Sequence, residues 1–589
     1  MRLAFDIEAD GLYWDASRVH CIVAQDLDTG EVHQFHGDRV SEGVIFLRKA
    51  SLLVGHHIIG FDIPALEKVY PEYSGFYLDK ANIKDTLVLS RLCFPNLSDL
   101  DRGKRGLDGS SIGSHSLRAW GQRLNLHKDD YDGGWAEFSE EMLAYCTQDV
   151  AVTVRLWKDI FENRNISPAA SELEHHCAWI VSEQERTGFL FDIRSAFALV
   201  QTLQSRQAAL EAELQDTFPP FFSAVEVKKH LRTLNGKKKA CEEGWEYTKI
   251  KLNVFNPSSR LHIAEAFKRR YNWQPKLFTE NGQPKIDEEL LDTLPFPEAK
   301  KLAEYLMIVK RLGALSDGQS AWLKLVKPDG RIHGSVNSTG AVTRRATHSS
   351  PNMTQVPSVG APWGKECRAL FTVPKGKKLV GIDVSGLELR MLAHFMNDPD
   401  YTKEVVEGDV HTANQKAAGL DTRNQAKTFI YAFLYGAGNA KIGSIVGKGA
   451  AHGAKLKAQF LERTPSLQRL VARVGSAARD RGYLLSLDKH PFHVRSEHAA
   501  LNTLLQGNGA LICKKWMCLV DDLIEDRYAG RVAQVVWAHD ELQFEADEDV
   551  ADTFAREAVA LIAETGKQFN LRVPLTGEYK IGNNWAETH

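Results

Sequence analysis

Acidic residues interrupt the most apolar strand-like segments of this chain. The first such segment, LAFDIEADGLYW, carries Asp6 and Glu8. Two later segments, KKLVGIDV and AQVVWAHDELQFEA, carry Asp383 and Asp540. A carboxylate buried at the end of an apolar strand is costly unless a cation or hydrogen bonds compensate its charge. These segments therefore predict β-sheets whose acidic edges bind cations.

The length of the chain, 589 residues, exceeds what one hydrophobic core accommodates. At about 150 residues per domain it predicts roughly four domains. The composition, 43% hydrophobic and 25% charged, is that of a globular protein and excludes a fibrous or disordered chain. No apolar run reaches about 18 residues, and the first ten residues lack the pattern of a signal peptide. We expect a cytoplasmic protein with no membrane partner.

The cysteines and charges give few functional signals. The cysteines include no C-x-x-C pair and no histidine spacing typical of zinc, so we expect reduced, mostly buried thiols. The net charge of −3 does not indicate a nucleic-acid-binding protein, although an average can hide a local patch. One basic run, Lys228 to Lys251, is such a patch, and it also fits a solvated face. The cysteines are Cys21, Cys93, Cys146, Cys177, Cys241, Cys367, Cys513 and Cys518.

The pattern of elements changes along the chain. Strand and helix patterns alternate to about Arg155, which predicts an α/β domain. From about Glu172 helical periodicity predicts long helices. The run FPPFF at 218–222 and the basic stretch after it break the helix and predict an exposed excursion, before helices resume near Ser258. After Gly330 strands and helical blocks are mixed.

Four acidic residues in the first part of the chain predict one metal site. Asp6 and Glu8 are two apart in a strand, so both carboxylates face one side. Asp62 follows an apolar segment, and Tyr145 and Asp149 share one face of a predicted helix. Four like charges require cations, and two magnesium ions would balance them. Paired ions are the usual apparatus of phosphodiester chemistry, whereas an isolated D-x-E is more often a polar strand end.

A second site is predicted downstream. Asp383 ends one strand, and His539, Asp540 and Glu541 lie at the expected turn of a hairpin, so we expect Asp383 and Asp540 to form a second two-metal site. Two unrelated strand ends are the alternative.

A helical segment favours the metal-site interpretation. In TRNQAKTFIYAFLYGAG a residue every four positions forms one stripe, which starts with two cations and ends with two aromatic rings. This order suits a triphosphate at one end and a base or sugar at the other, although an amphipathic surface helix has the same spacing. The stripe consists of Arg423, Lys427, Tyr431 and Tyr435.

At these residues the sequence resembles the family A DNA polymerases, over nearly the whole chain. Asp6 with Glu8, Asp62, and Tyr145 with Asp149 resemble the three exonuclease motifs of the family. DVSGLELR, RNQAKTFIYAFLYG and HDE resemble its polymerase motifs A, B and C, in the expected order. FNPSS, YLMIVKRLG, HGSVNSTGAVTRRATHSSPNMTQVP and HVRSEHAALNTLLQGNGALICK also resemble segments of a phage member of the family.

The resemblance implies a multidomain α/β and α+β fold. An RNase-H-like 3′–5′ exonuclease domain would be followed by a right-hand polymerase domain with palm, fingers and thumb. The implied divisions are the exonuclease at 1–165, the thumb at 166–330 with a short basic insertion at about 223–254, the palm at 331–400 and 490–589, and the fingers at 401–489. The implied function is DNA-directed synthesis from a primer with proofreading, as in the replicative polymerase of a phage.

The resemblance also assigns roles in the polymerase site. Asp383 and Asp540 would hold magnesium, with the Val384 carbonyl as a further ligand and Glu541 assisting, and manganese could substitute. Positive groups that bind the incoming deoxynucleoside triphosphate would be His411, Arg423 and Lys427. Tyr431 and Glu388 would line the sugar pocket, which excludes a ribose 2′-hydroxyl by steric clash. Tyr435 would lie near the templating base.

Further implied contacts involve the primer–template DNA. They come from Arg345, Arg495, Asn502, Gln506 and His539. The minor groove is suited to testing base pairs, because its acceptors are nearly the same for all of them. A tyrosine at the position of Tyr431, where many relatives have phenylalanine, is associated in the family with ready use of dideoxynucleotides.

Three departures from the family pattern change these expectations. His57 replaces an asparagine of the second exonuclease motif; Asp62 remains, so we expect metal binding to persist. Arg344 replaces the glycine of the T-G-R segment, which predicts an added cation that tightens contact with the primer. A phage member of the family carries a long thumb insertion that binds host thioredoxin, and the stretch at about 223–254 is much shorter. We therefore do not expect thioredoxin binding, while a helicase-primase partner stays open.

Two other functions fit parts of the pattern. A single-subunit RNA polymerase shares the palm and the cationic helix, but Glu388 and the acidic N-terminal domain disfavour it. A catalytically silent DNA-binding protein with the same fold is disfavoured because every metal-site acid is present.

Overall fold

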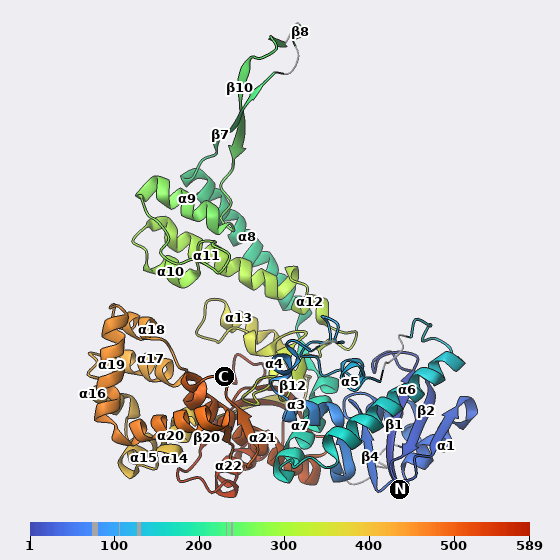
Figure 1. Ribbon diagram of the computed structural model, residues 1–589. Coiled ribbons are helices and arrows are strands. Elements are labelled where there is room, and N and C mark those ends of the chain that lie inside the picture. The colour runs from blue at the N-terminus through green and yellow to red at the C-terminus, as the bar shows by residue number, and fades with distance from the viewer. Residues whose placement is uncertain (74–79, 105, 127–130, 231–232, 237–238) are drawn as a thin grey trace. The chain divides into compact units, whose positions relative to one another are not determined.

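The computed structural model of the protein describes residues 1–73, 80–104, 106–126, 131–230, 233–236 and 239–589; for 234–236 and 239–241 it describes the backbone alone. The described chain divides into two compact units (Figure 1). The first unit comprises Met1–Phe189, His333–Gln355 and Val373–His589, and the second comprises Leu190–Ile332 and Val356–Thr372. The first unit is therefore discontinuous in sequence.

A five-stranded sheet organises the N-terminal part of the first unit. Its strand order is β3-β2-β1-β4-β5, with β1 antiparallel to β2 and parallel to β4. Helices cover both faces, so the apolar runs of β1 are buried on both sides. The strands are β1 (Arg2–Ala9), β2 (Val19–Asp26), β3 (Val32–His36), β4 (Leu52–Gly55) and β5 (Ile83–Asp85), and the helices are α1 (Val40–Leu47), α2 (Asp62–Val69), α3 (Thr86–Cys93), α4 (Leu97–Asp101), α5 (Leu117–Arg123) and α6 (Glu140–Leu156).

The alternation of β1 decides which face its acids occupy. Phe5 and Ile7 pack in the core shared with α1 and α2, whereas Ala4 packs in the core shared with α6. Because side chains two apart point to the same face, Asp6 and Glu8 lie on the face that α6 covers.

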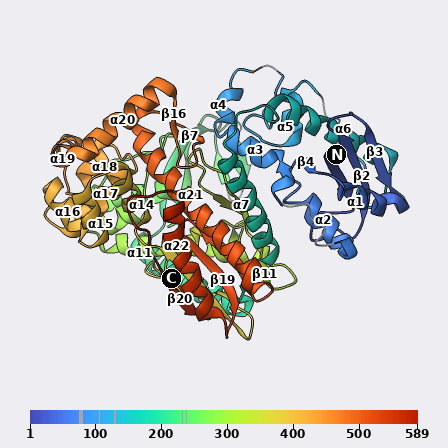
Figure 2. The ribbon, with the colours of Figure 1, turned by 90° about the horizontal axis from the view of Figure 1, so that it is seen from below.

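A second, antiparallel sheet lies in the C-terminal part of the first unit, in the order β18-β19-β15-β20. Its register pairs Asp383 with Glu541 and Val384 with Gly577. α22 packs against β15 and β20, and α21 packs against α22 (Figure 2). The strands are β15 (Lys377–Val384), β18 (Val532–Ala538), β19 (Glu541–Asp547) and β20 (Gly577–Gly582), and the helices are α7 (Pro168–Thr187), α14 (Leu387–Met396), α21 (Ala500–Leu523) and α22 (Ala551–Gln568).

Helices between α14 and α21 extend the core of this second sheet. One continuous set of buried side chains runs from Val380 of β15 through Phe429 to Phe460 and Leu467. The sheet and these helices therefore share one core. The elements are α15 (Pro399–Val406), α16 (Val410–Ala418), α17 (Arg423–Leu434), α18 (Asn439–Ser444), α19 (Ala450–Arg463) and α20 (Pro465–Arg481), with two short hairpins, β12 (Ser335–Asn337) with β13 (Thr347–Ser349) and β16 (Tyr483–Leu485) with β17 (Pro491–His493).

The second unit combines helices with a two-stranded ribbon. α8 packs against α11, and Phe218, Phe255 and Phe267 form an aromatic cluster beside the ribbon's base. β7 and β10 project from these helices as a long ribbon (Figure 1). The elements are β6 (Phe189–Phe191), α8 (Ile193–Thr217), β7 (Phe221–Lys229), β8 (Leu234–Gly236), β9 (Lys239–Cys241), β10 (Glu246–Asn253), α9 (Arg260–Tyr271), α10 (Glu288–Thr293), α11 (Pro297–Leu312), α12 (Trp322–Leu325), β11 (Arg331–Ile332), α13 (Gly364–Ala369) and β14 (Phe371–Thr372).

Several expectations about elements are confirmed. α8 ends at Thr217, helices resume at Arg260, and the excursion between them contains the exposed ribbon. The four predicted domain boundaries stay a prediction; α7 lies within the first unit, although the sequence placed it in the thumb. Among the described residues, Cys93 is partly buried, the other described free cysteines are buried, and no helix is both long and apolar enough to span a bilayer.

Candidate functional site

The N-terminal sheet holds a compact group of possible metal ligands. A carboxylate oxygen of Asp6, one of Glu8 and the Sγ of Cys146 lie within 4.8 Å of one another. Cys146 lies on α6 and its thiol donates to a carboxylate oxygen of Asp6 at 3.6 Å. Sequence reasoning missed this thiol. Its position three residues before Asp149 was the available signal, because that spacing puts both side chains on one helix face.

The other two predicted acids reach the same part of β1. Asp62 begins α2, and its Oδ1 accepts a hydrogen bond from the Ile7 amide at 3.2 Å, between the two acids of β1. Burial raises the pKa of Asp62 to about 8, and the nearby charges of Asp85 and Asp149 also raise it. Asp149 lies buried on α6. The fold therefore brings Asp62 to the strand that carries Asp6 and Glu8, and brings the charge of Asp149 to Asp62.

Aromatic rings lie beside this acidic group. The ring of Tyr145 is 5.6 Å from that of Tyr131 and 6.2 Å from that of Trp135, measured between centroids. Trp135 is 40% exposed, so this aromatic group is open to solvent next to the acids. The sequence pointed to Tyr145 alone, because the other two rings precede α6 and carry no helical spacing.

His57, the first departure from the family pattern, lies in a tight turn. Its backbone has a φ of 70°, and its amide donates to Asp85 Oδ1 at 2.9 Å. The residue lines a small cavity together with Asp85 and Arg91, and Asp62 does not line that cavity. The substitution therefore leaves the contact between Asp62 and β1 intact.

The second predicted acidic site lies at one end of the C-terminal sheet. Asp540 is in the two-residue turn between β18 and β19, and His539 in that turn has a φ of 64°. The Val384 amide donates to the Asp540 carbonyl at 3.1 Å, which ties the turn to the end of β15. Since β15 pairs with β19 through Asp383 and Glu541, the predicted hairpin turn and strand end are both confirmed as neighbours.

Asp383 and Asp540 both lie close to other negative charges, which raise their pKa values. Burial raises the pKa of Asp383 to about 7, and the charges of Asp540 and Glu541 raise it further. Burial also raises the pKa of Asp540 to about 6, with Glu388 as the next cause. A bound cation would remove these penalties, so the donor set fits a divalent metal.

Glu541 differs from its two neighbours. Its carboxylate accepts hydrogen bonds from Trp585 Nε1 and Gln543 Nε2, each at 2.6 Å, and contacts His589 Nδ1 at 2.8 Å. These contacts hold it against the sheet and the C-terminal segment. Among the described residues, three possible metal ligands, from Asp6, Glu8 and Cys146, lie within 4.8 Å of one another. Asp383, Asp540 and Glu541 do not form such a group of three.

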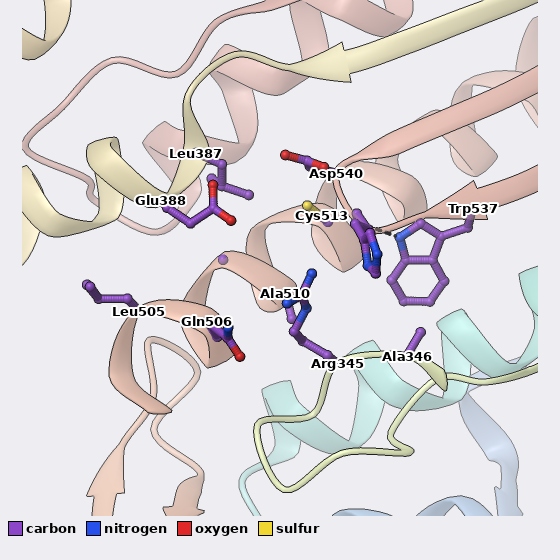
Figure 3. Close-up of a pocket in the computed structure, with 12 residues that line it drawn as sticks. Arg345, Ala346, Leu387, Glu388, Leu505, Gln506, Ala510, Cys513, Trp537 and Asp540 are labelled. Carbon is purple, nitrogen blue, oxygen red and sulfur yellow. Dashed lines mark hydrogen bonds between the residues drawn. The ribbon is translucent and has the colours of Figure 1, made fainter. Parts of the chain in front are cut away.

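A pocket opens beside Asp540 (Figure 3). Arg345 reaches into it from its loop, and Glu388 faces it from α14. The cavity volume, about 40 Å³, is too small for a nucleoside triphosphate, so the pocket forms only part of a larger site. The lining residues are Arg345, Ala346, Leu387, Glu388, Leu505, Gln506, Gly509, Ala510, Cys513, Trp537, His539 and Asp540.

In the predicted stripe of α17, Arg423, Lys427 and Tyr435 are exposed, whereas Tyr431 is partly buried against the core. The helix also buries Ala426, Phe429, Ile430 and Leu434. At the N-terminus of α17, Arg423 Nε donates to Asp409 Oδ2 at 2.7 Å. Asp409 also caps α16, which carries His411. Burial and the charges of Arg423 and Lys427 lower the pKa of His411, so these three predicted residues are neighbours.

The aromatic end of the stripe reaches the acidic site. The Tyr435 hydroxyl donates to Glu388 Oε1 at 3.0 Å. Burial raises the pKa of Tyr431, and the charges of Glu388 and Asp540 raise it further, which places Tyr431 near both acids. The stripe that begins with the cations of α17 therefore ends beside Glu388 and Asp540.

The remaining predicted contacts lie around this surface. Gln506 and His539 line the pocket beside Asp540. Asn502 is one turn before Gln506 on α21, and Arg495 is exposed after β17. The structure thus brings Gln506 and His539 to the acids and leaves Arg495 outside the pocket lining.

Arg344 corrects one expectation. The sequence predicted an added cation facing the primer, and this is wrong because Arg344 is only 1% exposed. Its guanidinium turns inward and pairs with Glu174 and Asp488. Arg345, the next residue, is the one that reaches the pocket.

Comparison with known proteins agrees with this geometry. The model of DNA polymerase family A matches residues 226–587. The chain is 38% identical to a DNA-directed DNA polymerase of Enterobacteria phage T3 over 100% of both chains, and 37% identical to that of Escherichia phage T7 over 99% of both. It also has the fold of the POL domain of Pol1 from M. smegmatis in complex with DNA primer-template and dNTP, with a TM-score of 0.75 at 18% identity, covering 100% of this chain and 95% of the other.

Proposed function

Because the chain belongs to DNA polymerase family A, we propose that its two acidic sites divide the work of such an enzyme. It is a DNA-directed DNA polymerase. The site at Asp383 and Asp540 extends the 3′ end of a primer. The site at Asp6, Glu8, Asp62 and Asp149 removes nucleotides from that end.

One observation carries the assignment of the synthetic site. The stripe of α17 starts with cations and ends at Tyr435, whose hydroxyl binds Glu388 in the pocket of Asp540. A nucleotide laid along this stripe would place its triphosphate near Arg423 and Lys427 and its sugar near Tyr431. Charge-assisted contacts with phosphate are the strong contacts of such a site.

Family members use divalent metal ions, and we propose two magnesium ions at each site, with manganese as a substitute. Bound ions would neutralise the attacking and leaving oxygens of phosphoryl transfer. Asp383, Asp540 and the Val384 carbonyl would hold them in the synthetic site, with Glu541 fixing the strand end. The raised pKa values of Asp383 and Asp540, caused by burial and like charges, support this fit.

The protein groups position the substrates of synthesis. Arg423, Lys427 and His411 bind the triphosphate and stabilise charge on the transferred phosphoryl group. Glu388 and Tyr431 close the sugar pocket. Arg423 is paired with Asp409 in the structure, so we propose that triphosphate replaces this carboxylate when it binds. Arg345, Arg495, Asn502, Gln506 and His539 contact primer–template DNA.

The proofreading site has its own supporting geometry. Asp62 of α2 reaches the Ile7 amide between Asp6 and Glu8 of β1, and the charge of Asp149 of α6 acts on Asp62. These acids would hold a pair of magnesium ions there. The rings of Tyr145, Tyr131 and Trp135 lie beside these acids and offer stacking surfaces for unpaired bases. Tyr145 would orient the attacking water.

We also propose that the chain serves phage DNA replication in the host cytoplasm, where a helicase-primase is a possible partner. We do not propose thioredoxin as a processivity factor. In the described residues of the segment at about 223–254, β7 pairs with β10 and β8 pairs with β9. Arg232, Lys237 and Lys238 of its basic cluster lie outside the described residues.

Primer extension tests the proposed function. Purified protein is incubated with a labelled primer–template and magnesium, with either deoxy- or ribonucleoside triphosphates. We expect extension with deoxynucleotides alone and shortening of the primer when nucleotides are omitted. Unprimed synthesis from ribonucleotides would instead support an RNA polymerase, and no magnesium-dependent synthesis would support a silent DNA-binding protein.

A further inference from the structure

Four charged side chains form a buried cluster in the first unit. Glu174 of α7 and Lys514 of α21 are 0% exposed, Arg344 is 1% exposed and Asp488 is 5% exposed. Arg344 lies between β12 and β13, and Asp488 lies between β16 and β17. We call these four residues the buried ion cluster. It joins two helices and two hairpins that are distant in sequence.

The contacts of the buried ion cluster centre on Arg344. Its Nε and Nη2 donate to Glu174 Oε1 at 2.9 and 2.8 Å, and its Nη1 lies 2.8 Å from Asp488 Oδ2. Lys514 Nζ donates to both carboxylate oxygens of Glu174 at 2.6 Å. Two cations and two carboxylates cancel, so the cluster is neutral as a whole. Removing one member leaves a buried charge unpaired, which is costly.

The backbone of Arg344 lies in the left-handed region, with a φ of 58°. This region favours glycine, and other residues that occupy it need compensating contacts. The Arg344 amide donates to the Ala341 carbonyl at 2.8 Å, and the Ala341 amide donates to the Arg345 carbonyl at 3.1 Å. These bonds define a turn at 341–345. Ion pairs therefore fix the side chain of Arg344, and backbone hydrogen bonds fix the turn to which it belongs.

The last residue of this turn, Arg345, faces the pocket beside Asp540. Arg345 lines that pocket with Asp540 and Glu388 (Figure 3). Burial raises the pKa of Asp540 and Glu388 adds to this, while the positive charge of Arg345 opposes both. The two consecutive side chains thus point in opposite directions. Arg344 enters the core, and Arg345 faces the pocket beside Asp540.

We propose that Arg344 is a positioning residue, whose pairing in the buried ion cluster fixes the turn at 341–345 and so holds the Arg345 guanidinium in the pocket of the palm acids. The proposal rests on the proposed synthetic function of that pocket. Lysine cannot replace Arg344 fully, because Arg344 binds two carboxylates with a planar fork.

A double-mutant cycle tests this role. Arg344→Gly, Arg345→Ala and the double variant are compared with the wild-type chain in single-turnover nucleotide incorporation. Arg344→Gly keeps the backbone conformation available and removes the guanidinium. We expect it to lower the rate of incorporation about tenfold, and to add less than about twofold in the Arg345→Ala background, because residues that act through one another are not additive.

Two further readouts separate positioning from loss of stability. Degradation of single-stranded DNA at the N-terminal site should stay within about twofold in every variant, since that site does not contain the turn. The variant Arg344→Gly with Asp488→Asn removes the unpaired carboxylate and should restore the unfolding temperature without restoring incorporation.

The outcomes are distinct. The proposal would be overturned if Arg344→Gly lowered the incorporation rate by the same factor in the wild-type chain and in the Arg345→Ala variant. It would also be overturned if adding Asp488→Asn to Arg344→Gly restored both the unfolding temperature and the incorporation rate. A wild-type chain that incorporates no nucleotide would instead refute the proposed function of the pocket. Synthesis unaffected by Arg345→Ala would also overturn the positioning role, because Arg344 would then have nothing to position.

Discussion

Asp383 shows how one residue becomes a functional group through its neighbours. An isolated aspartate in water ionises near its ordinary pKa, but burial and the charges of Asp540 and Glu541 raise the pKa of Asp383 to about 7. Although the surrounding protein desolvates the carboxylate, part of the residue remains accessible to solvent at the strand end, where a cation can reach it. Its protonation and metal binding therefore compete near neutral pH.

This competition predicts pH-dependent metal binding. When the pH is below the pKa of Asp383, about 7, or of Asp540, about 6, a proton must leave that carboxyl before metal binds. Manganese affinity should thus be nearly full at pH 8 and fall about twentyfold by pH 6. Calorimetric titration of the Asp6→Ala, Glu8→Ala variant reports mainly the site at Asp383 and Asp540.

Asp383→Asn is the matched control for that titration. It removes the group with the higher pKa, so the remaining affinity should be weaker and change less between pH 6 and pH 8. Identical affinity of the parent protein at both pH values would contradict the prediction.

Tyr431 makes a second prediction for a single residue. Its ring lies near Glu388 and Asp540, so its hydroxyl is available to the sugar end of a nucleotide. We expect ready dideoxynucleotide incorporation. Tyr431→Phe should increase discrimination against dideoxynucleotides about tenfold, since one hydrogen bond contributes roughly 1 to 1.5 kcal/mol.

Competition between deoxy- and dideoxynucleotides measures this discrimination directly. Phe433→Tyr is a suitable control, because it adds a hydroxyl to α17 away from the stripe. Equal use of dideoxynucleotides by Tyr431→Phe and the wild-type protein would contradict the proposed role of Tyr431 in the sugar pocket.

At the scale of elements, the ribbon of β7 and β10 separates two kinds of surface. Phe222 pairs with Leu252 and Ala224 pairs with Ile250, so these neighbours share an apolar, exposed face. The other face carries Lys228 and Lys249, which both pair with Glu226.

These ion pairs predict a minor role for Lys228 and Lys249 in DNA binding. Each phosphate contact contributes about 0.9 to the slope of log affinity against log salt. We expect Lys228→Ala with Lys249→Ala to lower this slope by less than about 0.9, because the single negative charge of Glu226 offsets only one of the two lysine charges. Fluorescence anisotropy with primer–template DNA at several salt concentrations measures the slope.

Arg423→Ala with Lys427→Ala is the comparison for that experiment, since it removes two exposed cations of α17. A decrease of about 1.8 in the slope for the ribbon variant would show that its lysines do contact phosphates.

At the scale of the whole molecule, the two acidic sites are built on different sheets. Asp6 and Glu8 lie in the five-stranded sheet, whereas Asp383 lies in the four-stranded sheet with Glu541 as its partner. Each sheet has its own buried core. The two chemistries should therefore be separable by mutation.

Asp540→Ala should reduce synthesis about a thousandfold or more, because it removes a metal ligand, and spare 3′–5′ degradation. Asp6→Ala with Glu8→Ala should have the opposite effect. Gel assays of one labelled primer, with and without nucleotides, measure both activities. Loss of both activities in either variant, while it remains folded, would contradict the division.

Sequence patterns predicted much of this arrangement because they are local. Alternation in β1 put Asp6 and Glu8 on one face, a four-residue spacing defined the stripe of α17, and strand–turn–strand composition located Asp540 in a hairpin turn. In each case the period of one element decides the direction of its side chains. The family pattern supplied their order.

Contacts between distant elements were decided only by the tertiary structure. The thiol of Cys146 beside Asp6, the link from Asp62 to Ile7 and the inward direction of Arg344 each depend on how elements pack. Arg344 is the clearest case: its charge suggested an exposed DNA contact, but Glu174 and Asp488 meet it in the core. A sequence defines which residues share a face of one element, whereas partners from separate elements follow from the packing that buries them.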